Sequence, residues 1–101
     1  MEDNMMQKYG INTQSKLCSD CNELEIEVGT TGFCGGDAGH GGKTYLRLKN
    51  KASTDMQIKV DDGDLKEANS FEILLSGDTE LKTFIEALDF ALTELKKKTK
   101  E

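Results

Sequence analysis

The sequence lacks any long apolar run. No stretch approaches the ~20 consecutive apolar residues that a membrane-spanning helix needs. Its first ten residues, MEDNMMQKYG, also lack the basic opening and the apolar stretch of a signal peptide. We therefore expect a cytoplasmic protein that has no membrane partner.

Basic residues are in the minority. The 101 residues include 13 Lys and Arg against 19 Asp and Glu, which gives a net charge of -6. A nucleic-acid backbone would on average be repelled by such a chain, so general nucleic-acid binding is disfavoured. An acidic surface of this kind suits a basic protein partner.

Cysteines are too few and of the wrong number for a disulfide framework. An odd count of three favours reduced thiols or a metal site. Internal repeats and coiled-coil heptads are also missing, and the length suits one domain. Residues 1–17 follow no helical or strand period, so we expect a flexible N-terminal arm there, followed by a single α+β domain over residues 18–101.

Alternating apolar and polar residues predict four strands. The first covers residues 23–28, with Leu24, Ile26 and Val28 on one face and three glutamates on the other. In the second strand, residues 44–49, a stripe that includes Arg47 and Lys49 could oppose those glutamates. The third and fourth strands are expected at residues 56–60 and 71–75.

The C-terminal segment predicts one helix. Asp78 can cap its start, and the lysines from residue 96 onward suit the negative end of the helix dipole. An apolar stripe consists of Leu81, Phe84, Ile85, Leu88, Ala91, Leu92 and Leu95. The expected fold is a four-stranded antiparallel sheet packed on this helix, with a long glycine-rich loop between the first two strands. Phe90 lies nearly opposite the stripe and is a candidate interface residue or a harmless surface aromatic.

Glycine is concentrated between the first two predicted strands, where it makes up half of the fourteen residues from 29 to 42. Glycine allows positive φ and close backbone approach, so we expect residues 29–43 to be the binding element. The candidate ligand-binding residues are Gly35, Gly36, Asp37, Gly39, His40, Gly41, Gly42, Lys43 and Thr44. Their amides could form an anion-binding nest for a small phosphorylated ligand such as a nucleotide signal, or contact a partner's backbone or a second copy in a homodimer.

The residues of this loop suggest three kinds of chemistry. The residues GGKT do not complete a phosphate-binding loop, because the first glycine of that motif would fall on Asp37. Cysteine chemistry would pair Cys34 with His40, but a glycine-rich loop gives little preorganisation, so we assign no catalytic residue and expect no enzyme. Zinc is the open alternative, and its ligands would be Cys18, Cys21, Cys34 and His40, spaced C-x2-C-x12-C-x5-H.

The segment 28–48, VGTTGFCGGDAGHGGKTYLRL, resembles small uncharacterised proteins of bacteriophages and mobile elements that carry a GGDxGHG segment before a strand. The resemblance implies a phage-type accessory or counter-defence factor in a bacterial cytoplasm. The sequence therefore predicts a small non-enzymatic binding protein that uses its glycine-rich loop. An acidic inhibitor of a host protein and a zinc-stabilised interaction module are the alternatives.

Overall fold

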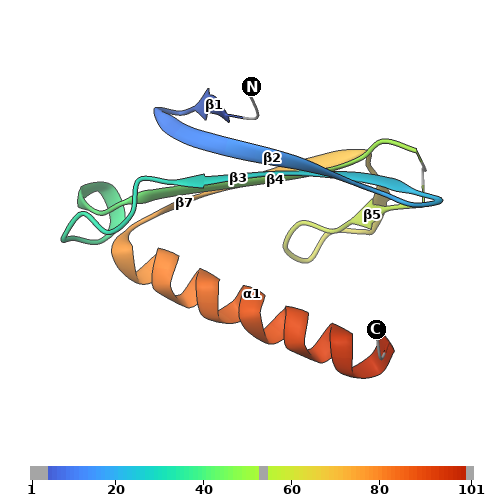
Figure 1. Cartoon of the computed structure of the whole chain (residues 1–101). Helices are drawn as coiled ribbons and strands as arrows, with labels where there is room; N and C mark the ends of the chain where they lie inside the picture. Colours follow the sequence, from blue (N-terminus) through green and yellow to red (C-terminus); the bar gives the residue numbers. More distant parts are fainter. Residues whose placement is uncertain (1–4, 53–54, 100–101) are drawn as a thin grey trace. The chain divides into compact units, whose positions relative to one another are not determined.

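The structure is a computed structural model that describes residues 5–52 and 55–99 (Figure 1). It belongs to the α+β class, as predicted, with one long helix and an antiparallel main sheet. The elements in chain order are β1 Met5–Lys8, β2 Ile11–Ser19, β3 Glu23–Thr30, the short 3-10 helix η1 Ala38–His40, β4 Lys43–Asn50, β5 Gln57–Ile58, β6 Lys66–Glu67, β7 Ser70–Ser76 and α1 Asp78–Thr99.

Among the described residues, the main sheet has five strands in the order β1-β2-β3-β4-β7, one more than predicted. Two backbone bonds fix the register of β3 and β4. Thr31 N–H donates to the Lys43 carbonyl at one end, and Lys51 N–H donates to the Glu23 carbonyl at the other. This antiparallel register sets Glu27 directly opposite Arg47, which confirms that the basic stripe of β4 faces the glutamates of β3.

The chain divides into two compact units. One consists of residues 1–30 and 45–74 and holds most of the main sheet together with the small β5-β6 sheet. The other consists of residues 31–44 and 75–101 and holds the glycine-rich loop and α1.

The prediction of a flexible N-terminal arm is wrong for residues 5–17, because these residues form β1 and most of β2. Tyr9 and Gly10 join the two strands, and their φ angles of 55° and 78° are those of a tight hairpin turn. Ile11 and Thr13 are both at most 1% exposed, so this hairpin contributes to the core. The mostly polar composition of β2 concealed its strand character. Residues 1–4 of the predicted arm lie outside the described residues.

The prediction of a third strand over residues 56–60 is also wrong in its length and in its pairing. Only Gln57–Ile58 is extended, and it pairs with Lys66–Glu67 in a separate two-stranded sheet. The acidic turn between them explains the difference, because Gly63 N–H donates to the Val60 carbonyl and Asp61 adopts a φ of 53°. The chain therefore folds back locally instead of continuing as a long strand.

Helix α1 begins at Asp78, as predicted, and ends at Thr99. Acidic residues occupy its first turn and lysines its last, which suits the helix dipole. Leu81 is its buried residue, and Phe90 is 67% exposed. Within the described ranges, no helix is both long enough and apolar enough to cross a membrane.

Candidate functional site

The glycine-rich loop, residues 31–44, wraps the start of α1, and we name it the capping loop. Its centre is the Asp78 carboxylate, which accepts backbone N–H groups from three loop residues. The distances from a carboxylate oxygen are 3.0 Å to Cys34 N, 2.7 Å to Gly35 N and 2.8 Å to Gly42 N. Hydrogen bonds to a charged acceptor are stronger than neutral ones. Asp78 thus holds together loop residues that lie more than thirty positions earlier in the chain.

Bonds in the opposite direction complete this attachment. Asp78 N–H donates to the Gly36 carbonyl at 2.9 Å, and Thr79 N–H donates to the Asp37 carboxylate at 3.0 Å. Gly77 N–H donates to the Gly42 carbonyl at 2.8 Å. The first N–H groups of a helix have no partner inside the helix. Here the loop supplies acceptors, so the loop and the helix start stabilise each other.

Close packing explains why glycine is needed at Gly42. A Cβ atom there would overlap the Gly32 carbonyl oxygen and lie 3.1 Å from Thr31 Oγ1. At Gly35 the cause is different, because its φ of 93° lies in a region that side-chain-bearing residues rarely adopt. The glycines therefore let the loop approach the helix start and turn tightly around it, a role within the chain itself.

The electrostatics of the cap follow from the same contacts. The amides of Cys34 and Gly42 are the main cause that holds the pKa of the Asp78 carboxyl below its ordinary value of 3.8. Desolvation opposes them, and the Gly35 amide adds a smaller lowering contribution. A carboxyl with a depressed folded-state pKa stabilises the fold fully above its unfolded-state pKa. That contribution is lost as the pH falls through the folded-state value.

We therefore expect an acid-sensitive difference between the wild type and Asp78→Asn. The wild type should be the more stable protein at neutral pH, and the gap should narrow as the pH falls below 3.8. Thermal unfolding over a pH series measures it. The matched control is Asp89→Asn on the exposed surface of the same helix, which should leave the pH profile close to that of the wild type. A gap between wild type and Asp78→Asn that stays constant down to the lowest pH would contradict the prediction.

The predicted ligand residues lie together in the capping loop, but several of their backbone groups already have partners. The Gly35 and Gly42 amides bind Asp78, the Gly36 carbonyl accepts from the helix start, and the Asp37 carboxylate caps Thr79. Among the other candidates, Gly39 and His40 are exposed residues of η1. Gly41 is half-buried, and Thr44 is buried in β4. The backbone N–H of Lys43 donates to Thr31 Oγ1 at 2.9 Å. Three of the loop amides thus bind an anion that the chain itself supplies, the Asp78 carboxylate, and binding of an external anion stays a prediction.

The zinc ligands predicted from the spacing fall on different elements. Cys18 lies near the end of β2, and Cys21 lies in the turn that follows this strand. Cys34 and His40 belong to the capping loop. All three cysteines are free thiols and exposed. Among the described residues, no group of three or more His, Cys, Asp or Glu side chains is placed to hold a metal ion.

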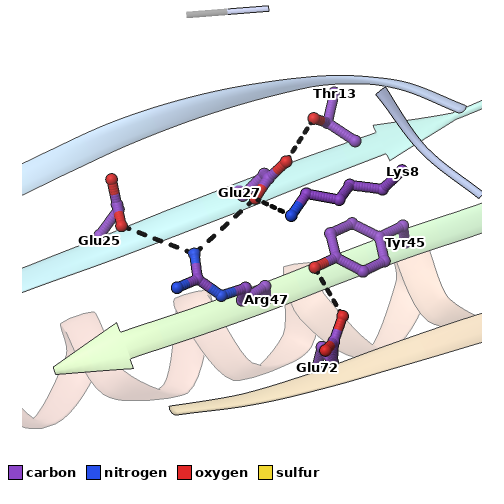
Figure 2. A network of polar contacts seen from close by, with 7 residues as sticks. All are labelled: Lys8, Thr13, Glu25, Glu27, Tyr45, Arg47 and Glu72. Carbon is purple, nitrogen blue, oxygen red and sulfur yellow. Dashed lines mark hydrogen bonds and ion pairs between the residues drawn. The ribbon is translucent and has the colours of Figure 1, made fainter. Parts of the chain in front are cut away.

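A second polar cluster lies in the sheet and was not predicted as a site (Figure 2). Glu27 is only 2% exposed, although Val28 beside it is 41% exposed, which reverses the expected facing of β3 at this point. Thr13 Oγ1 donates to its carboxylate at 2.5 Å, and Arg47 Nη1 and Lys8 Nζ lie 3.8 Å and 4.0 Å from it. A buried carboxylate needs such partners.

Tyr45 extends this cluster. Its hydroxyl donates to Glu72 at 2.8 Å, and its ring packs against Tyr9 with the centroids 5.7 Å apart. Burial, and then the hydrogen bond to Glu72, raise the pKa of Tyr45 well above its ordinary value. Tyr45 therefore stays protonated and serves as a hydrogen-bond donor in the core. The cluster is a structural network whose residues come from five strands, β1, β2, β3, β4 and β7.

Comparisons of the chain with protein-family models, with curated proteins and with solved structures find no match.

Proposed function

We propose that this chain is a small non-enzymatic binding protein whose capping loop recognises a partner protein. The observation that supports this proposal is Phe33, an aromatic side chain that is 64% exposed on a loop whose backbone is held on both sides. Exposed aromatic residues on ordered backbone are frequent energetic centres of protein interfaces.

Hydrogen bonds restrain the backbone on each side of Phe33. Before it, Thr31 N–H donates to the Lys43 carbonyl at 2.9 Å. After it, the Cys34 and Gly35 amides are bound by Asp78. A loop that is ordered before binding loses less conformational entropy on association, so Phe33 is presented at a low cost.

A phosphorylated small molecule is the less favoured ligand. Its phosphate would compete with the Asp78 carboxylate for the Cys34, Gly35 and Gly42 amides. The two negative charges would also repel each other. A protein partner that packs on Phe33 leaves the cap intact. The resemblance to phage and mobile-element proteins makes a bacterial host protein the first partner to test.

We expect Phe33→Ala to weaken partner binding by about thirtyfold, because truncation of an interface hot spot costs roughly 2 kcal/mol or more. A partner captured from bacterial lysate and identified by mass spectrometry is purified, and its affinity is measured for each variant. The matched control is Phe90→Ala, which removes an equally exposed phenylalanine from α1.

Two results would count against this proposal. Loss of binding in Phe90→Ala with retention in Phe33→Ala would place the contact on the surface of α1. The second result is a nucleotide that binds in calorimetry and binds more tightly to Asp78→Asn than to the wild type. The loop amides would then be an anion site from which the Asp78 carboxylate must be displaced.

A further inference from the structure

Strand β7 is the terminal strand of the main sheet in the described part of the chain. At the start of its ladder with β4, Asn50 N–H donates to the Asn69 carbonyl at 2.7 Å. Backbone groups alternate in direction along an antiparallel strand, so those of Phe71 and Ile73 face β4 and those of Glu72 and Leu74 point away from the sheet. The outward groups form an edge to which another strand can pair.

This edge lacks the usual protection against strand pairing. Proteins commonly guard an edge with lysine, proline or a bulge. Between Ser70 and Ser76 there is no lysine and no proline, and Glu72 is the one charged residue. That glutamate accepts the Tyr45 hydroxyl at 2.8 Å. The edge is therefore open to a partner strand.

A groove of about 620 Å³ follows the same edge. Its lining includes three successive residues, 71–73, and the segment 58–61 of the β5-β6 hairpin. Successive residues of a strand point to opposite faces, so a groove that touches all three runs along the strand's edge. Val60 in this lining is 71% exposed, which leaves apolar surface for an incoming side chain.

Charge indicates the kind of segment that fits. Residues 58–73 contain five carboxylates and two lysines, a local net charge of -3. A basic segment is attracted to such a surface, whereas a second copy of this chain, with a net charge of -6, is repelled.

We propose that the β7 edge binds an extended segment of a partner protein in which apolar and basic residues alternate. The segment adds as a sixth strand and pairs with the outward N–H and C=O groups of Glu72 and Leu74. Its apolar residues lie on the side of Phe71 and Ile73, and its basic residues lie on the side of Glu72. The residues of this surface are not those of the capping loop, and the proposal does not depend on the function of Phe33.

The test uses an acetylated and amidated octapeptide that alternates lysine and valine, titrated into the full chain and followed by backbone amide NMR. Shifts should centre on β7 and on residues 58–61, and added salt should weaken binding. Two further peptides carry N-methyl groups, on the lysines or on the valines. One of them should bind at least tenfold more weakly than the parent, because only one set of amides faces the edge.

A protein variant tests the same edge. Leu74→Pro removes an outward N–H while leaving the ladder to β4 intact, and it should reduce peptide affinity about tenfold. Leu74→Ala keeps the N–H and should bind like the wild type. If Leu74→Pro does not fold, the N-methylated peptides decide the question.

Three outcomes would overturn the proposal. The first is equal binding of both N-methylated peptides, and the second is equal binding of a peptide that alternates glutamate and valine. The third combines two results: the peptide does not bind, and analytical ultracentrifugation shows a dimer of the wild type that Leu74→Pro dissociates. The edge would then pair with a second copy of the chain.

Discussion

Gly42→Ala should lower the free energy of unfolding by on the order of 3 kcal/mol, because the added methyl group would overlap backbone atoms that are closely packed around Gly42. The Cβ atom would overlap the Gly32 carbonyl oxygen, so the backbone has to move. That movement disturbs two bonds of Gly42: its N–H to Asp78 and its carbonyl to Gly77 N–H, both 2.8 Å long. The methyl group therefore removes the cap as well as creating a clash. Urea unfolding of the purified variants measures the effect.

Gly39→Ala is the matched control. A Cβ atom at Gly39 would meet no atom within 4 Å, and its φ is not in the positive range. The substitution should change the free energy of unfolding by less than about 0.5 kcal/mol or stabilise the chain slightly, because alanine restricts the unfolded state. Similar values for the two alanine variants would disprove the claim that Gly42 is required by close packing.

The same two variants test whether partner binding depends on the ordered backbone of the capping loop as well as on the Phe33 side chain. Gly42→Ala keeps Phe33 in the sequence but loosens the backbone that presents it. If ordered presentation matters, partner affinity should fall in Gly42→Ala and stay unchanged in Gly39→Ala.

Much of the architecture could be predicted from hydrophobic periodicity. The segment 23–28 alternates strictly, the segment 71–75 places Phe71, Ile73 and Leu75 on one face, and α1 has acidic residues at one end and lysines at the other. Local patterns of this kind depend on nearby residues, so the sequence contains them directly. Strand β2 was missed because Thr13 and Ser15 are polar and still face the interior, Thr13 being completely buried.

The candidate site was harder to predict, because its contacts are remote in sequence. Asp78 was predicted to cap α1, but its carboxylate accepts loop amides, among them that of Cys34, 44 residues earlier, and Thr79 N–H donates to Asp37. Nothing local in the sequence indicates these contacts. Likewise, alternation in β3 separates two faces without showing what covers each one. The face that carries Glu27 is closed by residues of β1, β2 and β4, which tertiary structure alone brings together.

Glu27→Ala is expected to be the most damaging substitution in the sheet. It removes the acceptor of the Thr13 hydroxyl and leaves that fully buried group without its partner. It also leaves a space in the core and takes the shared anion from Arg47 and Lys8. Breaking a buried ion pair commonly costs 3–5 kcal/mol. The side chains of Arg47 and Lys8 are 24% and 34% exposed and can be partly rehydrated, so we expect about 3 kcal/mol.

Glu25→Ala is a close control, because Glu25 lies on the same strand and the same face and also pairs with Arg47, at 3.6 Å. Its side chain is 27% exposed, so its ion pair is screened by solvent and the loss should stay below about 1 kcal/mol. Glu27→Gln should fall between the two, since its amide oxygen can still accept from Thr13 while the charge is lost. Urea unfolding of the three variants ranks them. If Glu27→Ala costs no more than Glu25→Ala, the buried carboxylate does not stabilise the sheet, and burial of Glu27 would have to be explained without its polar contacts.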